Sequence, residues 1–154
     1  MIRIRTDRPR AIVIDIDGVV MNSDKIFQDI YNLKLKGDAM WEYFHRNCND
    51  SRKVSIIQNI LPLLSSLDPT VYVILSTARN ELCRIDTERR LHEENFHFDF
   101  LYMRSSEDYR PSPEVKADHL AIIRRHFDII CFIDDDLSNC EMAKSMGILS
   151  LRKV

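Results

Sequence analysis

The chain has 154 residues, about the size of one globular domain, and its 45% hydrophobic and 30% charged residues are typical of a folded rather than a disordered protein. Its 22 Lys and Arg residues against 24 Asp and Glu residues give a formal net charge of −2 at pH 7, which argues against a strongly basic nucleic-acid clamp or a polybasic membrane anchor. The longest apolar runs reach five residues, so no segment is expected to span a bilayer.

Five short and almost continuously apolar runs predict strands that are covered on both faces, as in a parallel sheet. The runs are Ala11 to Ile16, Val71 to Leu75, Phe98 to Met103, Ile129 to Ile133 and Ile148 to Leu151. Helices are expected at Ser51 to Leu67, Asn80 to Asn95, Pro113 to Phe127 and Leu137 to Met146, with Gly147 as the C-cap of the last. This alternation predicts an α/β fold with a doubly wound, Rossmann-like, mostly parallel five-stranded sheet, whose active crevice lies at the carboxyl ends of the strands.

The stretch between the first two predicted strands, residues 19–70, is about twice as long as one crossover helix needs. It contains two further helical or irregular pieces, Ser23 to Lys36 and Asp38 to Asn47. An insert at this place would lie over the strand ends. We therefore expect a single domain, residues 1–154, in which residues 19–70 form a small helical cap and a connecting helix. Whether the insert closes as a lid stays open.

Carboxylates gather where two of the predicted strands end. The first strand runs into the sequence DIDG at 15–18, and the fourth runs into DDD at 134–136. Clustered carboxylates repel one another unless a cation neutralises them, and oxygen-only ligands without a nearby His or Cys suit Mg²⁺. A solvated loop or a helix N-cap is the alternative for either run taken alone.

Two more side chains complete a set suited to phosphoryl transfer. Thr77 follows the second predicted strand, and Lys116 precedes the fourth. A hydroxyl and an ammonium group can hold phosphoryl oxygens while a metal ion neutralises the charge of the transition state. Taken singly, Thr77 also fits a helix cap, and Lys116 also fits a solvated surface charge.

In their order along the chain, these residues resemble the haloacid-dehalogenase-like (HAD) hydrolases, which are mostly Mg²⁺-dependent phosphatases. The match consists of DIDGV at 15–19, a strand ending in Thr77, then Lys116, then IDDD at 133–136, and it covers nearly the whole chain. The resemblance implies that Asp15 is the nucleophile and forms an aspartyl-phosphate. It also implies that Asp17 is the general acid and base, which favours phosphatase over dehalogenase chemistry.

The same resemblance implies a magnesium site. Asp134 and Asp135 would hold the ion directly or through water, and which of them is the direct ligand stays open. The Asp15 carboxylate and the Asp17 backbone carbonyl would be further ligands.

Three other features near these motifs have simpler expected roles. Asp136 is extra to the family pattern and fits a helix N-cap. Ser76 is an alternative to Thr77, because the family motif fixes the strand end loosely. The five histidines show no metal-ligand spacing.

Within the family, the C-terminal half is most similar to the 3′-phosphatase domain of phage polynucleotide kinase. The similarity lies in HFDIICFIDDD at 126–136, in the lysine eighteen residues before Asp134, and in the preceding strand with Met103 and the Arg110 loop. Three glycines cannot form a kinase phosphate loop, so no kinase half is expected. The resemblance implies a phosphomonoesterase for the 3′-phosphate end of a polynucleotide. The alternative is a 5′-nucleotidase-like phosphatase for nucleoside monophosphates.

Three arginines are candidates for binding a phosphorylated nucleotide or nucleic-acid end. Arg79 comes shortly after the second strand, and Arg104 and Arg110 lie beyond the third. A guanidinium group can bind phosphate in a bidentate manner. A surface salt bridge is the alternative for each of them.

The insert carries three aromatic residues close together in the sequence, Trp41, Tyr43 and Phe44. They could stack on a nucleobase. At helical spacing they also fit the small core of a cap, and the sequence leaves both roles open.

Two hypotheses compete with an enzyme. A receiver-like signalling domain also has a doubly wound fold with an acidic cluster, a Thr and a Lys, but its acidic pair comes first and its Lys last. A catalytically idle binding module is disfavoured because all the motif positions carry usable residues. The physiological substrate, the partner proteins and the oligomeric state stay open.

The N-terminal segment and the cysteines bear on localisation. MIRIRTDRPR carries four arginines without an apolar stretch long enough for a signal peptide, so a cytoplasmic setting is expected. The four cysteines form no C-x-x-C pair and are expected to be reduced and structural.

Overall fold

The computed structural model describes residues 7–154 and contains one five-stranded sheet. Its strands are β1 (Arg10–Ile14), β4 (Tyr72–Asn80), β5 (Phe100–Arg104), β6 (Asp128–Asp134) and β7 (Ser150–Arg152). They lie in the order β5-β4-β1-β6-β7, and every neighbouring pair is parallel. This confirms the predicted fold class. The N-terminal segment behind the cytoplasmic prediction lies partly outside the described residues.

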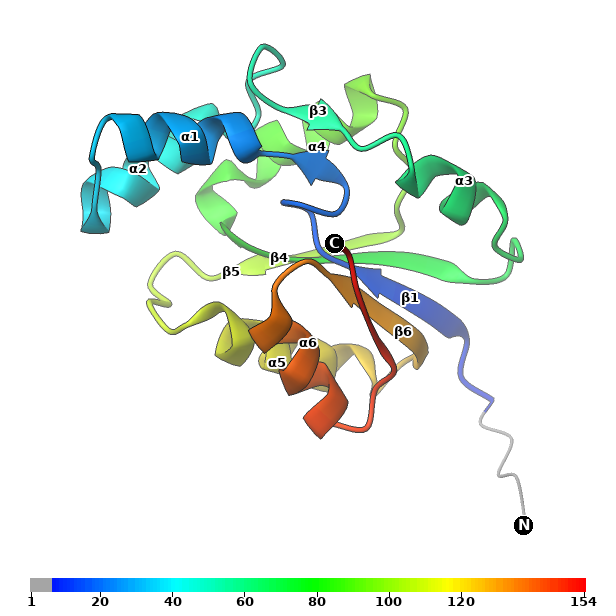
Figure 1. Cartoon of the computed structure of the whole chain (residues 1–154). Coiled ribbons are helices and arrows are strands. Elements are labelled where there is room, and N and C mark those ends of the chain that lie inside the picture. The colour runs from blue at the N-terminus through cyan, green and yellow to red at the C-terminus, as the bar shows by residue number, and fades with distance from the viewer. Residues whose placement is uncertain (1–6) are drawn as a thin grey trace.

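Helices cover both faces of the sheet (Figure 1). Successive residues of β1 point to opposite sides, as the two-residue period of a strand requires. Ala11 and Val13 belong to the core cluster with α5 (Ser112–Ile123) and α6 (Leu137–Ser145). Ile12 and Ile14 belong to the larger cluster with α4 (Arg84–Glu93) and the insert. This double burial explains why the strand sequences are apolar throughout.

Three of the predicted helices are confirmed with small shifts at their ends. A 3₁₀ turn, η1 (Glu81–Cys83), precedes α4 because β4 continues to Asn80. Asp136 caps α6, as predicted, by accepting a hydrogen bond from the Ser138 amide at 2.8 Å. Gly147 follows α6 with φ +76° and donates from its amide to the Lys144 carbonyl at 3.0 Å. It is the helix-ending residue that was expected.

The helix predicted at 51–67 is wrong in its first half. Residues 51–53 form a turn, and β3 (Ser55–Ile56) pairs antiparallel with β2 (Met21–Asn22). Only α3 (Ile60–Ser65) is helical, and Pro62 lies in its first turn. A proline is tolerated there but not deeper inside a helix, so the helix could not begin much earlier.

The rest of the insert consists of α1 (Asp24–Asn32) and α2 (Gly37–Asn47), which pack against each other (Figure 1). Helix α1 lies within the first predicted piece, and α2 matches the second except that it begins one residue earlier, at Gly37. A polar contact joins them, because the Tyr43 hydroxyl donates to Asp29 at 3.0 Å and the Lys53 ammonium donates to the same carboxylate at 3.1 Å. We call this helix pair, α1 and α2, the cap, after the role predicted for it, and Phe44 of α2 is buried.

Within residues 7–154, no helix is long and apolar enough to cross a membrane. The four cysteines are free thiols, and Cys48, Cys131 and Cys140 are buried. The cytoplasmic setting stays a prediction.

Candidate active site

The structure brings the predicted carboxylates together at the carboxyl ends of β1 and β6. Ile14 is paired with Ile133, and the Asp15 amide donates to the Ile133 carbonyl at 2.9 Å. The next residues of both strands, Asp15 and Asp134, therefore lie side by side. Asp15, Asp134 and Asp135 each place one carboxylate oxygen within 4.8 Å of the others. Asp15 and Asp134 are buried, whereas Asp135 is exposed.

Lys116 reaches this cluster from α5. Its ammonium group lies 2.8 Å from Asp15 Oδ1 and 2.6 Å from Asp134 Oδ2, and the side chain is buried. Asn139 donates to both oxygens of Asp134 at 3.2 Å, and the Asp136 amide donates to Oδ1 at 2.9 Å. Asn139 is not among the residues predicted from the sequence, in which it is only a polar residue in the first turns of the helix after the acidic run. These contacts fix the Asp134 carboxylate.

The electrostatics of the cluster favour a divalent cation. Three carboxylates face one ammonium group, so the fully ionised cluster carries a net charge of −2. Burial raises the pKa of Asp15 to about 8, although Lys116 opposes this shift. Burial also opposes the charged form of Lys116, but Asp15 and Asp134 outweigh it and raise its pKa. An all-oxygen donor set of this charge fits Mg²⁺.

Gly18 makes room for this cluster. It has φ +86°, and a Cβ placed on it would lie 2.1 Å from Asp135 Oδ2 and 2.5 Å from Asp135 Cγ. The site therefore requires glycine both for the left-handed backbone and for the close approach of Asp135.

We expect Gly18→Ala to weaken Mg²⁺ binding by roughly 10-fold, because the methyl group would displace a candidate metal ligand. It should also lower the free energy of unfolding by about 1–2 kcal/mol, because a Cβ is strained in the left-handed conformation. Calorimetric titration with Mg²⁺ and urea unfolding measure the two effects. Gly147→Ala is the matched control, since Gly147 has φ +76° but no atom within 4 Å of its added Cβ. Equal Mg²⁺ affinity in the Gly18 variant and the wild type would contradict the prediction.

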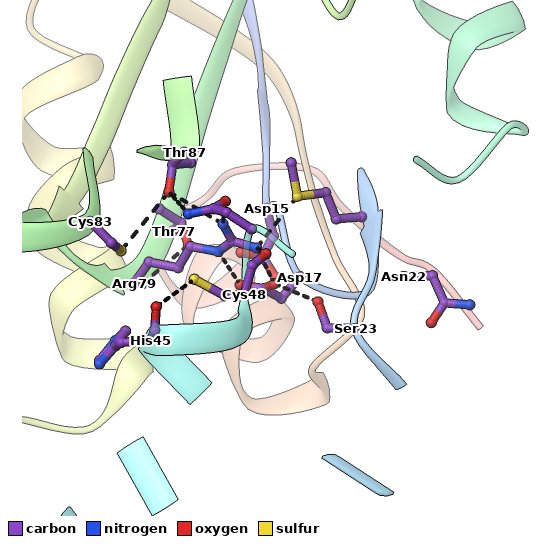
Figure 2. Close-up of polar contacts among 12 residues, drawn as sticks. Asp15, Asp17, Asn22, Ser23, His45, Cys48, Thr77, Arg79, Cys83 and Thr87 are labelled. Atoms are coloured by element: carbon purple, nitrogen blue, oxygen red, sulfur yellow. Dashed lines mark hydrogen bonds and ion pairs between the residues drawn. The ribbon is translucent and has the colours of Figure 1, made fainter. Parts of the chain in front are cut away.

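Asp17 faces the same cavity and is held by Arg79 (Figure 2). Arg79 Nε donates to Asp17 Oδ2 at 2.9 Å, Nη2 donates to Oδ1 at 2.7 Å, and the Ser23 hydroxyl donates to Oδ1 at 2.6 Å. Burial disfavours the Asp17 carboxylate, but the charge and hydrogen bonds of Arg79 outweigh it and hold the pKa below its ordinary value. The carboxylate is thereby fixed in position and kept ionised.

The arrangement favours a positioning role for Arg79 over the predicted contact with substrate. Its side chain is buried, and all three guanidinium nitrogens already have partners. Beyond Asp17, these partners are Asn49 Oδ1, Thr87 Oγ1, the Met21 sulfur and the Cys48 carbonyl. Ser23, Asn49 and Thr87 are not among the predicted site residues, because no sequence pattern marks them. Arg79 thus links the cap insert to the carboxylate beneath it.

Thr77, rather than Ser76, lies at the cavity. Both residues are buried inside β4, which extends five residues beyond its predicted end because Ser76 and Asn80 still pair with β5. Thr77 lines the cavity, and its Oγ1 accepts from the Arg79 amide at 3.1 Å, so its own proton remains available. The Ser76 hydroxyl instead lies 2.8 Å from His119 Nδ1.

His119 provides a test of this core contact. Its Nε2 lies 3.1 Å from the Met103 carbonyl, which can only accept, so Nδ1 of the neutral ring accepts from Ser76. Burial lowers the pKa of His119 from 6.5 to about 4, and nearby Lys116 and Arg104 act in the same direction against Met103 and Asp118.

Because the unfolded chain binds the proton of His119 more readily, its contribution to stability is complete above about pH 6.5 and is lost as the pH falls towards about 4. We expect this contribution to fall by about 2 kcal/mol between about pH 7 and about pH 5, measured by urea unfolding. His119→Gln should flatten this dependence, whereas His92→Gln on the exposed side of α4 should not. An unchanged slope in the His119 variant would show that the ring is not the titrating group.

Arg104 and Arg110 lie in and after β5 and do not line the cavity of the carboxylates. Arg104 donates to the carbonyls of Ala78 at 3.0 Å, Asp108 at 3.0 Å and Arg110 at 2.6 Å. Arg110 forms ion pairs with Asp108 at 2.7 Å and Asp118 at 2.6 Å. Their contacts organise the loop after β5, so the salt-bridge alternative describes Arg110 and the predicted substrate contact of both stays a prediction.

A cavity of about 580 Å³ joins the carboxylate cluster to the cap. On the core side it is lined by Asp15, Asp17, Thr77, Lys116, Asp134 and Asp135, and on the cap side by Phe27, Trp41, Phe44 and His45. The structure thus places the six residues predicted for catalysis and metal binding around one space.

Comparisons with known proteins agree with this geometry. A sequence model of the family described as "Polynucleotide kinase PNKP phosphatase domain" matches residues 9–152. No curated protein sequence matches at a significant level. A solved chain of the Pnkp1/Rnl/Hen1 RNA repair complex has a TM-score of 0.77 and 21% identity, with 97% of this chain and 43% of that chain covered. This chain therefore spans less than half of that protein.

Smaller solved proteins share the fold over most of their length. A haloacid dehalogenase-like hydrolase from Streptococcus pneumoniae has a TM-score of 0.64 and 17% identity, with 94% of this chain and 84% of that chain covered. A HAD family enzyme from Bacteroides thetaiotaomicron, solved as a magnesium complex, has a TM-score of 0.58 and 20% identity, with 96% and 94% covered. At these identities the likeness shows the fold.

Proposed function

Since this chain belongs to the family of polynucleotide kinase PNKP phosphatase domains and is a HAD phosphatase, we propose that it removes the 3′-phosphate from the end of a polynucleotide. The reaction would depend on Mg²⁺ and proceed through an aspartyl-phosphate on Asp15. One observation carries this proposal: Asp15, Lys116, Asp134 and Asp135 meet at the strand ends, with Asp17 held across the same cavity.

The residues present fit a resident Mg²⁺ ion. The carboxylates of Asp15, Asp134 and Asp135 would hold it, together with the Asp17 backbone carbonyl that the family resemblance implies. When bound, the ion would neutralise the charge on the transferred phosphoryl group. Lys116 already lies between Asp15 and Asp134, where its ammonium group opposes the effect of burial on the pKa of Asp15 and holds both carboxylates at the cavity.

In the first half of the reaction, an oxygen of Asp15 attacks phosphorus, and the bond from phosphorus to the 3′-oxygen of the sugar breaks. Asp17 donates a proton to that leaving oxygen. Arg79 lowers the pKa of Asp17, but a negatively charged phosphate next to it acts in the opposite direction and favours the protonated acid. The Thr77 hydroxyl is free to donate to a phosphoryl oxygen.

In the second half, Asp17 takes a proton from a water molecule that attacks the aspartyl-phosphate. Inorganic phosphate leaves, and the Asp15 carboxylate is restored. The low pKa of Asp17 suits this step, because the carboxylate is ready as a base once the sugar has departed. Arg79 and Ser23 hold it in place for both halves.

Phosphate release from a substrate panel tests the proposal. The panel contains 3′-phosphorylated and 5′-phosphorylated oligonucleotides, nucleoside monophosphates and sugar phosphates, each with Mg²⁺ or with EDTA. We expect Mg²⁺-dependent release that is fastest from the 3′-phosphorylated oligonucleotide. Preference for nucleoside monophosphates would replace this substrate by the second candidate, which the cavity of about 580 Å³ also suits in size. Turnover that persists in EDTA would contradict the metal requirement.

A further inference from the structure

The cap side of the cavity has a different chemistry from the phosphate side. Phe27 of α1 and Trp41 and His45 of α2 line it, and these two helices lie together above the core (Figure 1). Arg79 is the buried arginine of the cavity wall, and its guanidinium group is already bonded to Asp17. Burial and the charge of Arg79 lower the pKa of His45, so this ring is neutral at neutral pH. The cap side therefore suits a flat, uncharged group.

The structure separates the aromatic residues that the sequence could not. Phe44 is 4% exposed and forms the core of the cap, and the Tyr43 hydroxyl is engaged with Asp29 and Lys53. Trp41, in contrast, is 50% exposed, and Phe27 is 46% exposed, although both are large apolar side chains. Phe27 is not among the aromatic residues predicted from the sequence for this role.

Trp41 and Phe27 are held rather than loose. The Trp41 ring packs edge-on against Phe44 with centroids 6.1 Å apart, and it stacks on His45 at 6.4 Å with an interplanar angle of 28°. The Phe27 ring also packs on Phe44, with centroids 5.5 Å apart. A rigid aromatic surface loses little conformational freedom when a ring stacks on it.

We propose that Trp41 and Phe27 form a subsite for the nucleobase of the nucleotide that carries the scissile phosphate. This inference rests on the proposed function and extends it to the base. It follows from the continuity of one cavity, which joins these two side chains to Asp15 and Lys116. Stacking on an aromatic face accepts every base, so the subsite should tolerate sequence but require a base.

The same geometry predicts a preference for unpaired ends. A base can stack in this cavity only after leaving its partner and its neighbour in a duplex, which has an energetic cost. A single-stranded end avoids most of that cost. We therefore expect lower KM values for single-stranded 3′-phosphorylated oligonucleotides than for the same end in a blunt duplex.

The subsite is tested by changing the enzyme and the substrate separately and then together. Wild type and Trp41→Ala are each assayed on a single-stranded 3′-phosphorylated oligonucleotide and on the same oligonucleotide with an abasic 3′-terminal nucleotide. For the substrate with a base, we expect Trp41→Ala to raise KM about tenfold with kcat within about twofold. In the wild type, removing the base should raise KM by a similar factor. When Trp41→Ala is assayed on the abasic substrate, KM should rise little beyond the value for either change alone, because both changes remove the same interaction.

Further variants separate stacking from a structural effect. Trp41→Phe should recover most of the lost affinity. Tyr31→Ala removes an exposed aromatic of α1 that does not line the cavity, and it should leave both constants unchanged. Trp41 is the single tryptophan of the chain, so its fluorescence should be quenched by the 3′-phosphorylated oligonucleotide in an Asp15→Asn background and less by the abasic one.

The outcomes distinguish this subsite from the proposed function. If wild type hydrolyses the 3′-phosphorylated oligonucleotide with the same KM whether or not the base is present, the subsite is wrong and the function stands. An unchanged KM in Trp41→Ala would overturn the subsite in the same way. If wild type hydrolyses no 3′-phosphorylated oligonucleotide but does hydrolyse aryl phosphates, both proposals fail, and the aromatic cap face binds another class of ring.

Discussion

Replacement of Asp15 by Asn should reduce phosphate release by roughly 1000-fold or more, because the amide cannot attack phosphorus and form the aspartyl-phosphate. The change keeps the size of the side chain and removes an ionisable group from a cluster that carries a net charge of −2 when fully ionised. The variant should therefore fold, and its midpoint of urea unfolding in EDTA should not fall below that of the wild type.

Two further measurements test whether the loss of activity comes from the loss of the nucleophile. Acid quench during turnover, followed by mass spectrometry, should show one added phosphoryl group on the peptide that contains Asp15 in the wild type and none in Asp15→Asn. Asp38→Asn is the matched control, since Asp38 is an exposed carboxylate of α2 outside the cavity wall, and it should retain full activity. Normal turnover in Asp15→Asn would show that another residue is the nucleophile.

Lys116→Met should lower the free energy of unfolding by about 3–5 kcal/mol and abolish most of the activity. The methionine side chain fills a similar space but leaves Asp15 and Asp134 buried without their shared ammonium group. The loss should be largest in EDTA and smaller at saturating Mg²⁺, because a bound divalent cation supplies part of the missing positive charge. Urea unfolding under both conditions measures the effect.

A second substitution tests the electrostatic reason for this loss. Adding Asp134→Asn to Lys116→Met removes one of the two carboxylates left without a cationic partner, so the double variant should recover part of the lost stability. Lys144→Met, at an exposed position in α6, should change stability by no more than about 0.5 kcal/mol. Equal losses at Lys116 and Lys144 would mean that the buried ion pairs are not the source of stability.

Much of the fold was predictable because parallel strands that are buried on both sides carry an unusually clear pattern. The five runs that begin at Ala11, Val71, Phe98, Ile129 and Ile148 all became strands of one sheet. The insert was less predictable. Ser55 and Ile56 form a strand because they pair with Asn22 and Met21, more than thirty residues away, and no local pattern signals such a contact.

In the candidate site, too, some residues were predictable from the sequence and others were not. Asp15, Thr77 and Asp134 lie at or near strand ends, and the rule that parallel strands end at one edge of a sheet brings them together. Lys116 reaches them from helix α5. Arg79 illustrates the opposite case. Its position shortly after the motif allowed either a phosphate ligand or a salt bridge. Only the structure shows that its buried guanidinium group bonds to Asp17 and to Asn49 of the insert, and its contact with substrate stays a prediction.

The sequence by itself determined the order of the motifs along the chain, the acidic character of the site and the chemistry that these residue types allow. Those properties depend on local patterns and on the residues themselves. Tertiary structure alone decided which polar groups are already paired and which face the cavity. It separated Trp41 from Phe44, assigned Ser76 to His119 and enclosed Arg79. Burial and hydrogen-bond partners arise from segments far apart in the chain, so a single sequence does not encode them as a pattern.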